Sequence, residues 1–205
     1  MVKDRFEGGE ATPALVLSDI EDLRAYERDR DRFRAEVRAL KRVRRVPIGP
    51  IVTVVFENRT TMRFQVQEMA RAERMMTDEQ IQGELDVYNP LIPGPGELSM
   101  TLFIELTTEP ELRRWLPKLV GIERAVLLRL GDDHEAVPAT VEAAHEAQLT
   151  REEVTASVHY VRIALDARQR ERFVAGPAAL AIDHPAYRHE ILLGDETRAS
   201  IASDW

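Results

Sequence analysis

The stretch Ile48-Gly-Pro-Ile-Val-Thr-Val-Val-Phe-Glu57 decides the fold class of this chain. Its apolar, β-branched residues follow a Gly-Pro turn signal and precede the breaker Asn58-Arg-Thr60, so the segment predicts a buried β-strand. The residues on both sides favour helices. A strand set between helical segments predicts an α+β domain with a mixed, largely antiparallel sheet.

Helical patterns flank this strand on both sides. Residues 18–45 predict a long N-terminal helix, and residues 60–76 and 77–88 predict two further helices. Capping-box pairs open the first and the third of these helices, namely Ser18 with Glu21 and Thr77 with Gln80. The proline-rich loop Asn89-Pro-Leu-Ile-Pro-Gly-Pro-Gly96 then excludes regular structure.

The second half of the chain favours strands. The segment 154–165 is ambiguous, because Thr150 and Glu153 are typical of a helix start whereas its Val, Thr, Tyr and Ile residues favour a strand, which we expect. The acidic, alanine-rich segment 132–148 indicates a mobile insertion or a short helix. The other predicted elements are strands at 98–106, 123–130, 178–182 and 189–193 and a helix at 109–119.

Length and hydropathy predict one domain. A chain of 205 residues that is 44% hydrophobic can bury one sizeable core and is short for two. We expect a loose N-terminal arm over 1–17 and a single α+β domain over 18–205. The charged first residues do not resemble a signal peptide, and no apolar run approaches the roughly 20 residues of a membrane helix. The expectation is a soluble, cytoplasmic protein without a membrane partner.

Composition and missing motifs narrow the possible chemistry. With no cysteine, this chain cannot ligate an iron–sulfur cluster, form a disulfide or use a thiolate, so any metal must use His, Asp or Glu. The net charge of −8 makes nucleic acid an unlikely partner. Phosphate-loop, serine-hydrolase and zinc-protease motifs are absent. The cofactor is therefore unknown.

Two charges stand inside the apolar stripes of the predicted helices. Arg30 interrupts the stripe of the first helix, and Glu73 interrupts that of the second. Because an isolated buried charge costs several kcal/mol, the simplest hypothesis is that Arg30 and Glu73 pair with each other. The alternative is that bending or fraying lets both side chains reach water.

Further polar residues are candidates for binding a ligand or a partner. Arg71 on the second helix, and Tyr88 and Asn89 before the proline-rich loop, could form the rim of a pocket with Arg30 and Glu73. Helix capping and turn formation are the simpler explanation at such positions. The basic run Arg38, Lys41, Arg42, Arg44 and Arg45 could meet an anionic partner, although a solvated helix face is the favoured interpretation.

Metal ligation has weaker candidates. His159 and His184, with Glu57 or Glu68, could hold a metal if the fold brings them together. A satisfied core or edge histidine is the favoured interpretation of His159, and His184 belongs to a turn. The motif Glu142-Ala-Ala-His145 matches half of a di-iron signature, but it occurs once and the predicted strands contradict a di-iron bundle.

Several segments together resemble a known family. They are Arg45-Val-Pro-Ile-Gly-Pro50, Phe56-Glu-Asn-Arg-Thr-Thr61, Gln67-Glu-Met-Ala-Arg-Ala-Glu-Arg74, Tyr88-Asn-Pro-Leu-Ile-Pro93, Ser157-Val-His159 and Asp183-His-Pro-Ala-Tyr187. In these residues the chain resembles the uncharacterised bacterial family called domain of unknown function 3501. The resemblance implies no particular activity, substrate or cofactor. It does imply a genetic association with rubrerythrin and iron–sulfur oxidoreductases, hence a role in redox, iron or peroxide handling.

Two classes of function remain. The first is an accessory or interaction protein of a redox system, which would bind a redox protein through the basic run or the proline-rich loop. The alternative is an enzyme or a ligand- or metal-binding domain with a pocket near Arg30, Glu73 and His159. A homo-oligomer is compatible with either class, and nucleic-acid binding by the basic run is a weaker third possibility.

Overall fold

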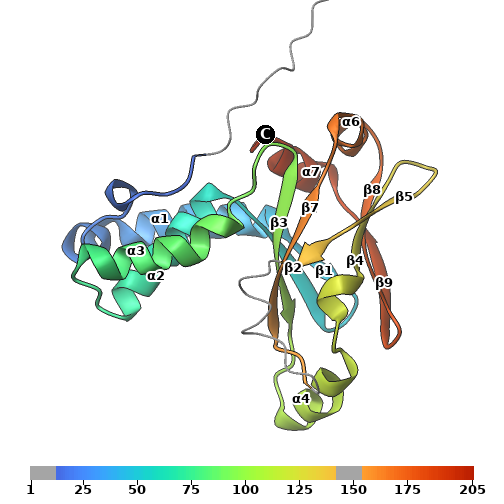
Figure 1. The fold of residues 1–205 in the computed structure, drawn as a ribbon, viewed down its shortest axis with the longest axis horizontal. Helices are drawn as coiled ribbons and strands as arrows, with labels where there is room; N and C mark the ends of the chain where they lie inside the picture. Colours follow the sequence, from blue (N-terminus) through green and yellow to red (C-terminus); the bar gives the residue numbers. More distant parts are fainter. Residues whose placement is uncertain (1–12, 142–153) are drawn as a thin grey trace, which may run out of the picture.

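The computed structural model describes residues 13–141 and 154–205. Figure 1 shows a layer of three long helices beside a body built from two β-sheets. The predicted α+β class and single domain are confirmed. The strands form two sheets rather than one mixed sheet, and each strand pairing in the described residues is antiparallel.

The helical layer consists of α1 (Leu23–Arg44), α2 (Arg59–Ala72) and α3 (Asp78–Tyr88). The long helix and the two further helices before the proline-rich loop are thus as predicted. Their boundaries differ. Helix α1 begins after Asp22, whose side chain accepts the N–H groups of Arg24 and Ala25. The predicted start falls instead in a short 3-10 helix, η1 (Leu17–Asp19).

The first sheet has the strand order β1-β2-β3-β7-β6. Of the segment predicted as one strand at 48–57, residues 52–57 form β2, whereas Ile48 ends β1. The chain turns at Gly49, where φ is +74°, so that β1 and β2 form a hairpin. The segment 154–165 forms a strand, as we expected. The strands are β1 (Arg45–Ile48), β2 (Val52–Glu57), β3 (Glu97–Ile104), β6 (Thr140–Val141) and β7 (Val158–Ala164).

The second sheet has the strand order β5-β4-β8-β9. Its strands are β4 (Val126–Leu130), β5 (Glu135–Pro138), β8 (Ala178–His184) and β9 (Tyr187–Leu192). Strands β5 and β6 lie in the segment predicted as an insertion or short helix, and residues 142–153, including the Glu142 to His145 motif, fall outside the described part. The remaining helices are α4 (Glu109–Trp115), α6 (Ala167–Ala175) and α7 (Asp195–Ala202), with 3-10 turns η2 (Asn89–Leu91), η3 (Leu116–Lys118) and η4 (Ile122–Ala125).

The main core lies between the two sheets and is built from their alternating apolar residues, such as Val54, Leu102 and Leu128, all fully buried. The helical layer packs on the other face of the first sheet, where Tyr160 of β7 contacts a second cluster that includes Met62 and Leu85. This division gives β2, β3 and β7 one apolar face towards the second sheet and one partly polar face towards the helices.

The N-terminal segment is docked over its described residues. Leu15 is buried, and its backbone N–H and C=O are both bonded by the side-chain amide of Asn89, at 2.8 and 2.9 Å. We expected a loose arm over residues 1–17, so the prediction is wrong for Leu15. The reason is a contact with a residue far along the chain, which no local pattern indicates.

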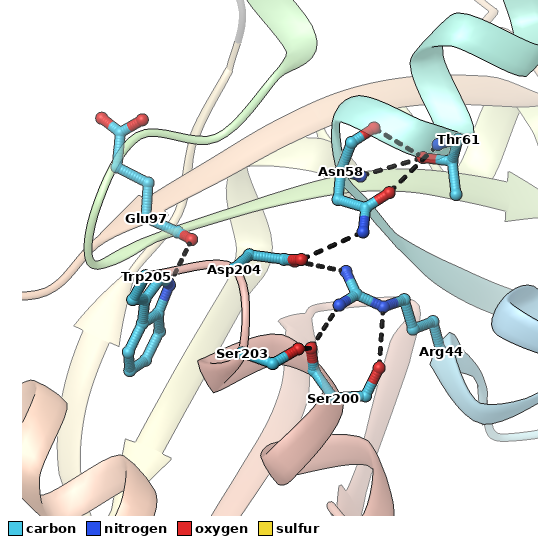
Figure 2. A network of polar contacts seen from close by, with 8 residues as sticks. All are labelled: Arg44, Asn58, Thr61, Glu97, Ser200, Ser203, Asp204 and Trp205. Atoms are coloured by element: carbon cyan, nitrogen blue, oxygen red, sulfur yellow. Dashed lines mark hydrogen bonds and ion pairs between the residues drawn. The ribbon is translucent and has the colours of Figure 1, made fainter. Parts of the chain in front are cut away.

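A buried arginine connects the end of α1 to the C-terminal residues (Figure 2). Arg44, 1% exposed, donates from Nη1 to Asp204 Oδ2 at 2.6 Å and from Nε to Ser200 Oγ at 3.0 Å. Asp204 Oδ1 also accepts from Asn58 Nδ2 at 3.0 Å, and Asn58 caps α2. The prediction that the basic run forms a solvated helix face is wrong for Arg44. The network ties α1, α2 and the end of α7 together.

None of the helices in residues 13–141 and 154–205 is both long and apolar enough to cross a membrane.

Candidate functional site

A row of arginines forms one face of α1. Arg34, Arg38 and Arg42 recur every four residues and therefore project from the same side of the helix. We call these three residues the basic face. They border an open cavity of about 300 Å³. The residues lining this basic cavity are Arg34, Val37, Arg38, Lys41, Arg42, Arg45 and Phe64.

Among the described residues, the basic face lacks the acidic partners that Arg30 and Arg32 of the same helix have. Within residues 13–141 and 154–205, neither Arg34, Arg38 nor Arg42 forms an ion pair or a side-chain hydrogen bond. By contrast, Arg32 on the same helix pairs with Asp29 and Glu36. Three uncompensated positive charges in a chain of net charge −8 create a local field of opposite sign to that of the whole molecule.

The buried carboxylate of Glu57 lies close to Lys41, which lines this cavity. Glu57 ends β2, its side chain is only 3% exposed, and the Nζ atom of Lys41 lies 3.8 Å from its Oε2 atom. Thr101 donates its hydroxyl to Glu57 Oε1 at 2.7 Å, whereas Oε2 has no hydrogen-bond partner among the described residues. Lys41 thus lies between the basic cavity and a buried negative charge.

The predicted Arg30 to Glu73 pair does not form. Arg30 instead makes a two-point contact with Glu68, from Nε at 2.8 Å and from Nη2 at 2.9 Å, and Tyr26 donates its hydroxyl to Glu68 at 2.6 Å. These hydrogen bonds lower the pKa of Glu68 to about 2. Glu73 follows the last residue of α2 and is exposed. The hypothesis of an Arg30 to Glu73 pair is therefore wrong, and the acid of α2 that pairs with Arg30 is Glu68.

The other predicted rim residues occupy separate places. Arg71 lines a different open cavity, of about 520 Å³, and pairs with Glu27 at 3.0 Å between Nε and Oε2. Tyr88 is half-buried, burial raises its pKa, and Gln65 Nε2 lies 3.5 Å from its hydroxyl. Asn89 holds Leu15. The structure therefore does not bring Tyr88 and Asn89 together with Arg30, whereas Arg71 lies near Arg30 and lowers the pKa of Glu68 together with it. Ligand binding by these residues stays a prediction.

His159 resembles the base of a catalytic triad at first inspection. Its Nε2 atom lies 2.9 Å from Thr155 Oγ1, and its Nδ1 atom lies 3.8 Å from Glu123 Oε2. However, Nε2 is also 2.9 Å from the carbonyl oxygen of Ala156, which can only accept a hydrogen bond. Nε2 must therefore carry a proton and cannot take one from Thr155, so the arrangement is not that of an activated nucleophile.

The candidate metal ligands do not converge. His184 has both ring nitrogens occupied by backbone, since Nε2 is 3.1 Å from Val120 O and Nδ1 accepts from Ala186 N at 3.2 Å. Glu68 is committed to Arg30, and Glu57 to Thr101. In the described ranges, no group of three or more His, Asp or Glu side chains is placed to hold a metal.

Sequence patterns did not identify Glu123 and Thr101, the residues that contact His159 and Glu57. Glu123 is the second residue of the 3-10 turn η4, and nothing in its local sequence indicates that it is buried beside His159. Thr101 reads as an ordinary strand residue, but its register opposite Val55 places it beside Glu57. Alternation along β3 could have placed Thr101 on the polar face, whereas Glu123 gave no comparable signal.

The fold and the site define an α+β protein with an open, cation-rich cavity on its first helix. The family model described as protein of unknown function (DUF3501) matches residues 14–205, so the chain belongs to this family, as its sequence indicated. A crystal structure of a protein of unknown function from Burkholderia pseudomallei K96243 has a similar fold, with a TM-score of 0.85 and 35% sequence identity. The similarity covers 94% of this chain and 99% of that one. Among functionally curated proteins, none matches.

Proposed function

We propose that this protein is an accessory protein that binds an acidic protein partner on the basic face of α1. The observation that carries the proposal is the set of three arginines, Arg34, Arg38 and Arg42, without acidic partners in the described residues. An acidic surface would supply the missing counter-charges, and complementary charge favours both the rate and the register of association.

The basic cavity supports a protein partner over a nucleic acid. Its floor is apolar, formed by Val37 and by Phe64, which stacks edge-on against Phe33 at 5.6 Å between ring centroids. An apolar side chain can fill such a floor while flanking carboxylates meet the arginines. A polyphosphate chain would use the cations but not the floor.

The redox, iron- or peroxide-handling setting remains part of the proposal. Its support is the family resemblance alone, and the contacts described above are independent of it. It predicts that the acidic partner is itself a redox or iron protein.

Photo-crosslinking tests the proposal. A photoreactive residue at position 38 in the native host should yield one dominant protein adduct, and the purified partner should bind the wild-type chain. Reversal of two charges, Arg38→Glu with Arg42→Glu, should weaken this binding by at least tenfold. The matched control is Arg28→Glu with Arg24→Glu, because these arginines lie on the same helix outside the basic cavity.

The outcomes separate the alternatives. Equal losses for both double variants would show a general charge effect and would reject the basic face as the site. A nuclease-sensitive adduct would favour nucleic acid instead. If the adduct is a protein without a redox or iron function, binding is retained and the redox setting is rejected.

A further inference from the structure

His159 and Glu123 form a buried ionisable couple away from the basic face. His159 is on β7 and Glu123 is in η4, and each side chain is only 2% exposed. Nδ1 of the imidazole lies 3.8 Å from Oε2 of the carboxyl group. Oε2 is buried and has no hydrogen-bond partner in the described residues. A buried oxygen in this position is costly unless something occupies the gap.

One nitrogen of the imidazole ring, Nε2, has a defined protonation state. Because Nε2 lies 2.9 Å from the carbonyl oxygen of Ala156, it carries a proton. In the neutral ring, Nδ1 then presents a lone pair towards Glu123. If the carboxyl group were ionised as well, two lone pairs would face each other across 3.8 Å, and the couple would bury a full negative charge.

We propose that His159 and Glu123 form a buried proton-binding site that holds one proton between Nδ1 and Oε2 in the folded protein at neutral pH. A protonated carboxyl group becomes a donor to Nδ1, and a small rotation of either side chain closes the contact. The couple then has no net charge. Burial lowers the pKa of His159 against the opposing effect of the Glu123 charge, and this lowered pKa favours the neutral ring.

Among the described residues, few other charges face this couple. Arg124 follows Glu123, and its Nε atom is 4.0 Å from Oε1, but its side chain is 68% exposed and does not reach Oε2. From β8, His184 has both ring nitrogens bonded to backbone. On β7, Tyr160 and Arg162 alternate with His159 and project to the opposite face of the sheet. Thr155 contributes a neutral hydroxyl at Nε2.

The site predicts a specific pH dependence. In the unfolded chain, Glu is ionised above roughly pH 4.3 and His is neutral above roughly pH 6.5. Between these two pH values the folded and the unfolded state each hold one proton, so the couple does not make the folding stability depend on pH. Above pH 6.5 only the folded state keeps the proton, and its stability therefore falls as pH rises, by up to about tenfold in the folding equilibrium constant per pH unit.

The variant Glu123→Gln tests this directly, since an amide donates to Nδ1 without a titrating proton. Chemical unfolding of the full chain from pH 6.5 to 9 should show the alkaline loss in the wild type and its absence in the variant. Infrared difference spectra give a second readout that does not depend on the variant's stability. The wild type at pH 7 should show the carbonyl band of a buried, protonated carboxyl group.

The matched control is Glu57→Gln. It alters another buried glutamate, whose Oε2 has no hydrogen-bond partner among the described residues but lies 3.8 Å from Lys41 Nζ. The protonated-carboxyl band should persist in Glu57→Gln and vanish in Glu123→Gln. The proposal fails if the wild type lacks this band at pH 7, or if wild type and Glu123→Gln lose stability in parallel above pH 6.5.

Discussion

Arg44 and Asp204 lie 160 positions apart in the sequence, yet Nη1 of the arginine donates to Oδ2 of the aspartate at 2.6 Å inside the protein. This contact joins the end of α1 to the residues that follow α7. Because Asp204 also accepts from Asn58, one carboxylate holds both the end of α1 and the start of α2.

Removal of this arginine should be among the most destabilising single changes in the chain. Arg44→Ala leaves Asp204 without its buried partner, and we expect a loss of about 3–5 kcal/mol in the free energy of unfolding, measured by urea denaturation. Arg42→Ala, an exposed neighbour with no ion pair in the described part of the chain, should change it by about 0.5 kcal/mol or less. Similar losses in the two variants would contradict the role of the buried contact.

The bridge between Arg30 and Glu68 should appear in the acid stability of the protein. Hydrogen bonds lower the pKa of Glu68 from 4.5 to about 2 in the folded state. A lowered folded-state pKa stabilises the protein above pH 4.5, and this stabilisation disappears as the pH falls from 4.5 towards 2. Glu68→Gln should therefore cost about 1–3 kcal/mol at pH 7 and progressively less in acid.

Glu73→Gln is the matched control for this experiment. Glu73 is exposed and has no ion pair among the described residues, so its replacement should leave the pH dependence unchanged. If instead Glu68→Gln kept a constant stability difference from the wild type between pH 7 and pH 2, the ion pair would not be the source of the acid sensitivity.

Sequence patterns predicted features that depend on residues a few positions apart, such as the start of a helix. The cap at Thr77 uses Gln80, three positions away, and α3 begins directly after it, whereas the Ser18 signal falls in η1 and α1 begins after Asp22. The choice of Glu73 was wrong because it required α2 to continue to Met76. The helix ends at Ala72, with Arg74 at φ +53°, and its buried stripe runs through Met62, Val66 and Ala70. No glycine or proline indicated this end.

Local sequence patterns do not predict contacts between segments that are distant along the chain. Arg44 looks like its exposed neighbours in the basic run, and only the return of α7 beside α1 gives it a carboxylate. Likewise, His159 was expected to be a satisfied core histidine, and its burial agrees with the alternation of β7. That Glu123 faces it depends on the path of the chain through η4, which local patterns do not encode.

Gly49 and Gly83 should respond in opposite ways to alanine. At Gly49 φ is +74°, and an added Cβ would lie 2.5 Å from His189 Cγ and 2.6 Å from the Tyr187 hydroxyl oxygen. Gly49→Ala should cost about 1–3 kcal/mol, seen as a lower midpoint of thermal unfolding. Gly83 lies within α3 with nothing within 4 Å, so Gly83→Ala should stabilise by about 0.5–1 kcal/mol. Equal shifts of one sign would contradict the turn geometry.

Lys41 and Glu57 should be energetically coupled. The side chain of Glu57 is 3% exposed, and Lys41 is the cation 3.8 Å from its Oε2 atom. Lys41→Met should therefore destabilise the wild type by about 1–2 kcal/mol, because it leaves the buried carboxylate without a counter-charge. In a Glu57→Gln background the same change should cost little, since the amide still offers an acceptor to Thr101 and carries no charge.

A double-mutant cycle measured by urea denaturation gives the coupling, for which we expect about 0.5–2 kcal/mol. In the control cycle, Arg42 is mutated together with Glu57 in place of Lys41. Arg42 lines the same cavity and forms no ion pair with Glu57 among the described residues. Coupling in the Lys41 cycle with none in the Arg42 cycle would show that Glu57 partly neutralises the charge of Lys41. The positive charge available to a partner would then come from the basic face. Equal coupling in both cycles would indicate that Glu57 responds to the general field of α1 rather than to Lys41.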